Sequence, residues 1–289
     1  IPASKSKSKK NEITINFDGT LVTYTPKDFI NITHGYAISI HKSQGGEFKL
    51  VIIPFTPSYK RMLYNKLIYT AVTRAKEKLI LTGNPLRQNL TTGTKEDAIK
   101  YFNQEFGVNF TANRKTLLII GGSLGAGTIN QSIIAHLEEL AESGIQVIWQ
   151  TGKNYFANCK AALRRDMNNI ICTAFISQMP MAYAMADLVI SRAGASSISE
   201  LCLLGKPSIL VPSPNVAEDH QTHNAMALVR KDAAILVKDI DAKEQMVGTA
   251  LALINDDEQL KVLHENILTL ALPDSARHIA EEVMKLAKK

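Results

Sequence analysis

Residues 117–127 read LLIIGGSLGAG, a short apolar run that passes directly into a glycine-rich turn. A run of this length is typical of a strand buried on both faces of a sheet. Strand and helix patterns then alternate to the end of the chain, and we expect strands at 117–120, 146–150, 169–173, 188–190 and 208–211. This order is typical of βαβ units, so we expect an α/β fold with a Rossmann-like, doubly wound parallel sheet.

Helical periodicity and turn signals account for most of the remaining chain. In the part with the sheet, the expected helices are 128–143, 155–165, 179–186, 197–204, 220–231, 242–254, 256–272 and 275–288. Alternating apolar residues at 13–17 and 21–24 flank Asp18-Gly19, a pair that suits a hairpin turn, so we expect a hairpin there. The pattern also predicts strands at 35–40, 50–54 and 78–82, and helices at 60–74 and 95–106.

The composition indicates a globular protein with a basic first part. The chain has 289 residues, of which 45% are hydrophobic and 21% charged, as is ordinary for globular proteins. Three scattered cysteines favour a reducing, cytoplasmic compartment over a disulfide framework. The net charge of +6 is the sum of +8 in residues 1–83 and −2 in residues 84–289, which indicates two pieces with different partners. A basic surface can bind nucleic acid or anionic lipid; the alternative is that residues 1–10 form a solvated, disordered lead.

Two turns have the character of anion sites. The glycine-rich turn at 121–127 and the segment SRAGASSISE at 191–200 each follow an expected strand and begin a helix, whose free N–H groups attract an anion. Neither has the spacing of a dinucleotide-binding turn, and a tight turn without a ligand is the alternative. For two side chains a purely structural role is the alternative. Ser196 or Ser197 can cap the helix, and Glu200 can close a capping box from Ser197. Arg192 can pair with Asp187.

Four motifs together resemble the donor-binding half of the MurG family: GGSLGA at 121–126, QTGK at 150–153, SRAGA at 191–195 and EDHQT at 218–222. The segment GNPLR at 83–87 is similar to the interdomain linker of that family. The resemblance implies a linker at 84–112 and the C-terminal domain of a GT-B glycosyltransferase at 113–289. Members of this family transfer N-acetylglucosamine from UDP-N-acetylglucosamine to a lipid-linked muramyl-pentapeptide in peptidoglycan synthesis, so the resemblance implies both partners.

The resemblance also implies a role for each matching residue. The uracil would be held by the backbone of Ile176, the ribose by Glu200 and the sugar hydroxyls by Gln221. The diphosphate contacts would come from Arg87, Ser123, Ala195, Ser196 and Ser197. No metal or cofactor is implied beyond the donor substrate, because no His, Asp and Glu set has metal-ligand spacing.

The acceptor-side half of the family carries the catalytic base and a membrane-docking patch, and it has no counterpart in this sequence. We therefore assign no catalytic residue and expect donor binding without complete transfer, since transfer needs an oriented acceptor. We expect a protein in the cytoplasm, or at the cytoplasmic face of the inner membrane with peripheral association only through the missing half.

Residues 11–83 resemble the C-terminal lobe of superfamily I DNA helicases of the RecD and UvrD type. HGYAISIHKSQGGEF at 34–48 and LIYTAVTRAK at 67–76 carry the resemblance. It implies that Gln44 and Glu47 belong to a nucleotide- and DNA-coupling loop and that Arg74 is an arginine finger. It also implies that residues 41–43 lie near single-stranded DNA. A helix-surface arginine is the alternative for Arg74. No G-x-x-x-x-G-K-[ST] motif occurs in the sequence, so ATP hydrolysis is not expected.

The two resemblances meet at residues 79–83, so we interpret the chain as a chimera of two families. A UDP-N-acetylglucosamine-dependent hexosyltransferase domain is the preferred function, because it occupies most of the chain. A DNA-binding helicase lobe is the alternative from another class, and a fusion without function is the third. The sequence leaves open whether the fusion is natural or an artefact of assembly.

Overall fold

The computed structural model describes residues 12–17, 20–27, 43, 45–54, 70–86, 89–91, 93–216 and 219–287. The chain divides into two compact units, Ile1–Glu47 and Phe48–Lys289. In the first unit, β1 (Ile13–Phe17) and β2 (Thr20–Tyr24) form the antiparallel hairpin that the Asp-Gly pattern predicts. The expected strand at 35–40 and most of the expected helix at 60–74 lie outside the described residues.

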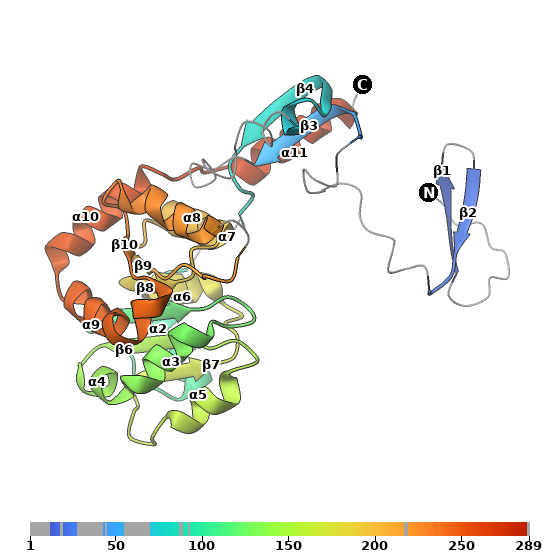
Figure 1. The fold of residues 1–289 in the computed structure, drawn as a ribbon. Coiled ribbons are helices and arrows are strands. Elements are labelled where there is room, and N and C mark those ends of the chain that lie inside the picture. The colour runs from blue at the N-terminus through green and yellow to red at the C-terminus, as the bar shows by residue number, and fades with distance from the viewer. Residues whose placement is uncertain are drawn as a thin grey trace. The chain divides into compact units, whose positions relative to one another are not determined.

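A six-stranded parallel sheet with the order β10-β9-β8-β5-β6-β7 forms the centre of the second unit (Figure 1). Its strands are β5 (Thr116–Ile120), β6 (Gln146–Gln150), β7 (Ile170–Thr173), β8 (Leu188–Ser191), β9 (Ser208–Leu210) and β10 (Ile235–Leu236). The chain winds outward from β5 to β7, returns to β8 beside β5, and then winds the other way to β10. The expected doubly wound parallel sheet is confirmed, and β5 and β8 flank its switch point, where sheets of this kind bind ligands.

Helices cover both faces of this sheet because alternate residues of a buried strand point to opposite sides. In β5, Leu117 and Ile119 enter one buried cluster, and Leu118 and Ile120 enter the other. On the first face lie α3 (Gly127–Ala135), α4 (Leu137–Glu142), α5 (Phe156–Ala162) and α9 (Ala242–Ile254). On the second lie α2 (Lys95–Phe106), α6 (Met179–Met185), α7 (Ala195–Leu204) and α8 (His220–Val229). Burial of each Leu or Ile side chain stabilises the fold by about 1.5–3 kcal/mol, so helices that shield both faces of the sheet from water stabilise the domain.

Several expected helix boundaries are wrong: the helix expected at 256–272 ends at Leu268, and the helix expected at 220–231 ends at Val229. The single helix expected at 128–143 is interrupted at His136, whose backbone leaves the helical region (φ −123°, ψ 25°) and whose ring Nδ1 hydrogen-bonds the Ser132 carbonyl at 2.9 Å. Helix α5 ends at Ala162 because Leu163 is extended. The two-residue strand β10 and the 3₁₀ turn η5 (Asp239–Asp241) were not expected, since elements this short have no periodicity.

Outside the main sheet, β3 (Phe48–Pro54) and β4 (Ala75–Thr82) form a parallel pair that helix α11 (Ser275–Ala287) contacts. Lys78 Nζ on β4 pairs with Glu282 Oε2 on α11 at 2.5 Å. Hydrogen bonds from Lys285 and Lys78 lower the pKa of Glu282 to about 2. At the end of β4, a Cβ added to Gly83 would lie 2.4 Å from Ser275 Oγ, so only glycine permits this approach.

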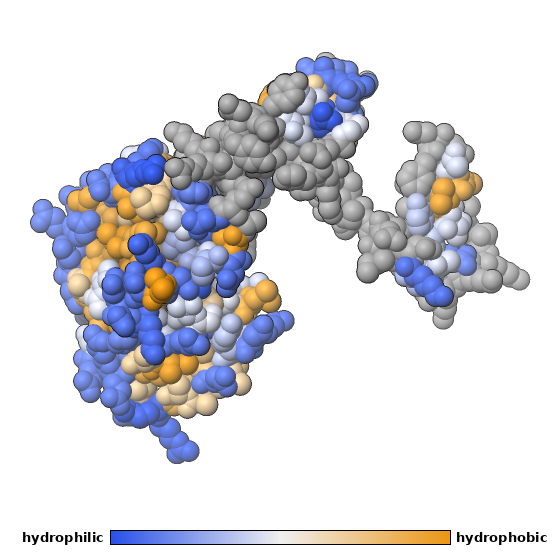
Figure 2. Space-filling view, in the orientation of Figure 1, coloured by the Kyte–Doolittle hydropathy of each residue, from blue (hydrophilic) through white to orange (hydrophobic). Residues whose placement is uncertain are grey.

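The surface seen in Figure 2 is largely hydrophilic, with hydrophobic residues in scattered patches. Helix α10 (Asp257–Leu268) contacts α7 and α9, and its sequence mixes charged residues with the apolar residues that it buries. Within the part of the chain that the structure describes, no helix combines the length and apolar character needed to cross a bilayer.

Candidate functional site

All strands of the main sheet are parallel, so the loops that follow them meet at one edge. Ile120, the last residue of β5, pairs with Ser191, the last residue of β8. The loops that begin at Gly121 and Arg192 therefore leave adjacent strand ends, on the two sides of the switch point. This places the two glycine-containing turns, which the sequence separates widely, next to each other at the carboxyl edge.

The loop after β5 is in backbone contact with the loop after β6. Gly125 has φ +87°, and a Cβ there would lie 2.1 Å from the Thr151 carbonyl oxygen. Gly152 has φ +80°, and a Cβ there would lie 2.2 Å from the Gly125 nitrogen. Neither position accepts a side chain, which fixes the path of the loop. Ser123 lies exposed at its turn, as a group that contacts a diphosphate must.

Gln150 joins this loop to the loop after β7. Its Nε2 donates to the Gly122 carbonyl at 3.1 Å, and its Oε1 accepts the backbone N–H of Ile176 at 3.1 Å. The side chain is 5% exposed, so both hydrogen bonds are shielded from water. With the Ile176 N–H engaged in this way, a base that contacts the Ile176 backbone would meet its carbonyl oxygen.

The capping alternatives for the turn after β8 are wrong. Helix α7 begins at Ala195 with Gly194 as its N-cap, and no described side chain caps it. Ser196 is exposed and Ser197 is half-buried, both within the first turn. Instead of closing a capping box, Glu200 accepts a hydrogen bond at Oε2 from Tyr183 Oη at 2.9 Å. The first-turn N–H groups of α7 therefore have no side-chain acceptor among the described residues, and can receive an anion.

Asn84 ties the linker to the same helix. Its Nδ2 donates to Ser199 Oγ at 2.9 Å and lies 3.4 Å from the Ala195 carbonyl. Ser199 Oγ in turn donates to the Ala195 carbonyl at 2.9 Å. The segment that follows β4 is therefore fixed against the start of α7.

The alternative partner for Arg192 is also wrong. Arg192 Nη1 donates to Asp239 Oδ1 and to the carbonyls of Val211 and Pro212, the latter two at 3.1 Å each. Asp239 Oδ2 accepts from Thr128 Oγ1, at the start of α3, at 2.9 Å. Both charged side chains are mostly buried. Arg192 and Asp239 therefore connect the loops after β8 and β9 with the helix that follows the glycine-rich turn.

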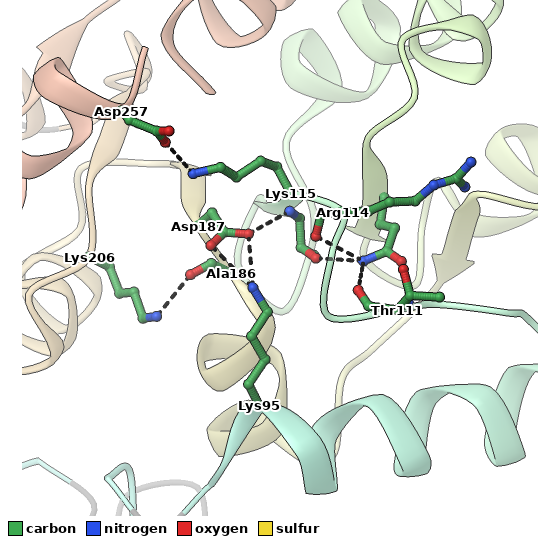
Figure 3. A network of polar contacts seen from close by, with 10 residues as sticks. Lys95, Thr111, Arg114, Lys115, Ala186, Asp187, Lys206 and Asp257 are labelled. Carbon is green, nitrogen blue, oxygen red and sulfur yellow. Dashed lines mark hydrogen bonds and ion pairs between the residues drawn. The ribbon is translucent and has the colours of Figure 1, made fainter. Parts of the chain in front are cut away.

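Asp187 instead forms its polar contacts at the amino edge of the sheet, opposite to the candidate site (Figure 3). Its carboxylate accepts the Thr116 N–H at 2.8 Å and pairs with Lys95 at 3.3 Å. Nearby, Lys206 Nζ donates to the Ala186 carbonyl at 2.8 Å, and burial lowers the pKa of this lysine. These contacts join the amino ends of β5, β8 and β9, away from the loops of the candidate site.

Gln221, on the first turn of α8, accepts the Ser213 N–H at Oε1 (3.0 Å), and its Nε2 donates to none of the described residues. The residue before the helix, Asp219, has φ +51°, and its carboxylate accepts from Thr222 Oγ1 at 2.6 Å. Further along α8, the buried Asn224 donates from Nδ2 to the Ala193 carbonyl at 3.1 Å. The loops after β8 and β9 are therefore held together by side chains of α8.

Two of the expected site residues, Arg87 and Gln44, lie outside the described residues. Glu47 is exposed at the end of the first unit. Arg74, in the second unit, donates from Nε to the Thr70 carbonyl at 3.0 Å. Its guanidinium is therefore bonded to the helical turn that precedes it, and the arginine-finger role stays a prediction.

Three residues to which the sequence gave no individual role organise the site: Asn84 and Gln150, which lie within the motifs quoted above, and Tyr183. Gln150 had a usable signal, since it is a polar residue at the carboxyl end of a buried strand. Tyr183 had none, because its partner Glu200 lies on another helix. No cluster of three metal-ligating side chains occurs among the described residues.

Comparisons with known proteins agree with this geometry. The family described as glycosyltransferase family 28 C-terminal domain matches residues 116–279, and the UvrD-like helicase C-terminal domain matches residues 34–82. Two relatives bear the name UDP-N-acetylglucosamine--N-acetylmuramyl-(pentapeptide) pyrophosphoryl-undecaprenol N-acetylglucosamine transferase. The one from Parabacteroides distasonis is 52% identical over 217 residues, which cover 74% of this chain and 57% of the relative. The one from Bacteroides thetaiotaomicron is 55% identical over 217 residues, or 73% and 57% of the two chains.

Solved structures share the fold at lower identity. Acinetobacter baumannii MurG has a TM-score of 0.54 and 23% identity, over 82% of this chain and 67% of that one. The UDP-GlcNAc 2-epimerase from Neisseria meningitidis, solved bound to UDP-GlcNAc, has a TM-score of 0.51 and 19% identity, over 76% and 58%. This chain spans little more than half the length of the curated relatives. From residue 116 to residue 279, the chain belongs to the glycosyltransferase family 28 C-terminal domain family.

Proposed function

We propose that this chain binds UDP-N-acetylglucosamine as the donor half of an N-acetylglucosaminyltransferase of peptidoglycan lipid-intermediate synthesis. The observation that carries the proposal is the meeting, at one switch point, of a glycine-rich loop and a helix start without a side-chain cap, with Glu200 on that same helix. The names of the relatives from Parabacteroides distasonis and Bacteroides thetaiotaomicron support the choice of donor sugar and of lipid-linked acceptor.

The diphosphate belongs at the switch point. A helix start carries about half a positive charge, and the N–H groups of Ala195, Ser196 and Ser197 supply donors there. The exposed Ser123 hydroxyl is a further donor from the adjacent loop. Arg87, in the linker, would add the positive charge that these neutral groups lack.

We assign the uracil, the ribose and the sugar of the donor to groups that flank the diphosphate site. The Ile176 carbonyl suits the N3–H of uracil, because its N–H is already bonded to Gln150. The Glu200 carboxylate suits the ribose hydroxyls, and Gln221 Nε2 suits the hydroxyls of the sugar. Polar groups of fixed direction give a site its specificity, since a wrong ligand leaves them unpaired.

Transfer requires an acceptor hydroxyl held beside the anomeric carbon and a base to deprotonate it. None of the groups assigned above supplies that base, so we expect binding of the donor without turnover by this chain alone. We place the protein in the cytoplasm or at the cytoplasmic face of the inner membrane, where a lipid-linked acceptor would be within reach.

Thermal unfolding with added ligand tests the proposal. A ligand present at about 100 times its Kd stabilises the folded state by about 2.7 kcal/mol, so UDP-N-acetylglucosamine and UDP should both raise Tm. ADP, which differs in its base, is the control and should have little effect. An equal shift with ADP, or no shift with UDP, would contradict the proposal.

A second candidate function rests on the helicase match at residues 34–82. We propose that this part derives from a helicase lobe fused ahead of the transferase domain, within boundaries of 11–83, 84–112 and 113–289 for the three parts. Contact with single-stranded DNA is the function it would retain. Salt-dependent binding of an oligothymidine by the whole chain would support that candidate, and no binding at low salt would exclude it.

A further inference from the structure

The buried Tyr183 contacts the carboxylate of Glu200, the group that the proposed function assigns to binding of the ribose. Tyr183, on α6, is 1% exposed, and its Oη donates to Glu200 Oε2 on α7 at 2.9 Å. We propose that Tyr183 is a positioning residue that fixes the Glu200 carboxylate toward the ribose hydroxyls, and that it thereby sets a preference for ribonucleotides over deoxyribonucleotides. This inference rests on the proposed function and adds the residue that makes the ribose contact selective.

The geometry of a carboxylate gives the first step. A glutamate in an open site turns freely about its last bond and accepts hydrogen bonds at about four lone-pair positions. The Tyr183 hydroxyl occupies one position on Oε2 and holds the carboxylate plane. Oε1 and the second lone pair of Oε2 then face a ligand in a fixed direction, which suits the two neighbouring hydroxyls of a ribose.

The rigidity of the anchor gives the second step. The Tyr183 ring belongs to the buried cluster on the α2 face of the sheet, with Phe102 among its members. A packed ring has one rotamer, so its hydroxyl has one position. The fold therefore holds the Glu200 side chain in one conformation before the ligand binds, and less side-chain conformational entropy is lost when the ribose binds.

The place of Tyr183 in the chain gives the third step. Helix α6 begins at Met179, three residues after Ile176, whose N–H is fixed by Gln150. Ile176, proposed for the base, and Tyr183, the anchor of the group proposed for the ribose, are therefore two buried residues of one short segment. A nucleoside would meet both in a constant relation, and removal of the tyrosine hydroxyl should disturb the ribose part alone.

A purely structural role would have another signature. If Glu200 only satisfies a buried hydroxyl, loss of that hydroxyl changes the stability of the fold and leaves nucleotide selectivity unchanged. The decisive quantity is therefore the ratio of the affinities for UDP and 2′-deoxy-UDP, which differ in one ribose hydroxyl.

Calorimetric titration of the full chain with these two nucleotides tests the proposal. We expect the wild type to prefer UDP, and Tyr183→Phe to weaken the binding of UDP about tenfold and that of 2′-deoxy-UDP less, because the deoxynucleotide keeps only one of the two hydroxyls. Glu200→Gln should have a similar effect, and the double variant should lose no more than Glu200→Gln alone, because the two residues act as one unit. Tyr101→Phe on α2 is the matched control and should bind both nucleotides like the wild type.

Three outcomes would overturn the inference. One is an unchanged affinity ratio in Tyr183→Phe, and another is an additive loss in the double variant. The third is a wild type that binds UDP and 2′-deoxy-UDP equally, which would leave the diphosphate and base sites of the proposed function standing. A wild type that binds neither nucleotide would instead refute the proposed function itself. Melting curves of each variant confirm that the compared proteins are folded.

Discussion

The side chain of Gln150 accepts the backbone N–H of Ile176 at 3.1 Å while its Nε2 donates to the loop after β5. One buried amide thereby joins the loop proposed for the diphosphate to the loop proposed for the base. Such a bridge uses both the donor and the acceptor of glutamine, so no other common residue of similar size replaces it.

Gln150→Leu should therefore weaken UDP binding as well as stability. Two buried hydrogen bonds are lost, and each group left unpaired costs about 1–3 kcal/mol. The matched control is Gln146→Leu, since Gln146 is buried at the other end of the same strand and donates to Thr116 Oγ1. It should lower Tm comparably and leave the Kd for UDP unchanged in calorimetry. Equal losses of UDP affinity in both variants would show that Gln150 has no special relation to the site.

Glu200→Ala should raise the Kd for UDP about tenfold, because a hydrogen bond to a charged group contributes about 1.5–3 kcal/mol. Glu139→Ala is the control, since Glu139 is exposed on α4 away from the carboxyl edge of the sheet. The measurement is isothermal titration at constant salt. An unchanged Kd for Glu200→Ala would remove the ribose from the roles of this residue.

Gly125→Ala should destabilise the protein strongly. The backbone at Gly125 has φ +87°, and the added Cβ would lie 2.1 Å from the Thr151 carbonyl. Gly144→Ala separates the two causes, since Gly144 has φ +77° with nothing within 4 Å of an added Cβ. We expect about 1–2 kcal/mol for the backbone strain at Gly144 and clearly more at Gly125, measured by denaturant unfolding. A Gly125→Ala variant no less stable than Gly144→Ala would contradict the close packing of the two loops.

The contact between α11 and β4 should persist into strong acid. Hydrogen bonds from Lys285 and Lys78 lower the pKa of Glu282 to about 2, so its carboxylate is ionised at any higher pH. A carboxylate with a depressed folded-state pKa stabilises the fold above its unfolded-state pKa, and this contribution is lost as the pH falls toward 2. An NMR titration of the Glu282 carboxyl in the wild type and in Lys78→Ala measures the effect, and the variant should titrate at higher pH.

Local pattern was sufficient for most of the longer elements. Lys95–Phe106, Gln146–Gln150 and Ala242–Ile254 have the bounds that periodicity predicts. Helical and strand periods depend only on neighbouring residues, and a short run of apolar residues predicts a buried strand. The break at His136 escaped prediction because the apolar period continues through it while the backbone does not.

By itself, the sequence determined that this protein has alternating strands and helices, a glycine-rich turn after a buried strand, and the motifs of a nucleotide-sugar transferase. Only the tertiary structure decided that β8 lies beside β5, that Arg192 pairs with Asp239 rather than Asp187, and that Glu200 bonds Tyr183 rather than its own helix cap. The physical reason is the range of the interactions. Secondary structure follows from contacts within a few residues, whereas a charged or polar side chain takes whichever partner the packing of distant elements brings within 3 Å.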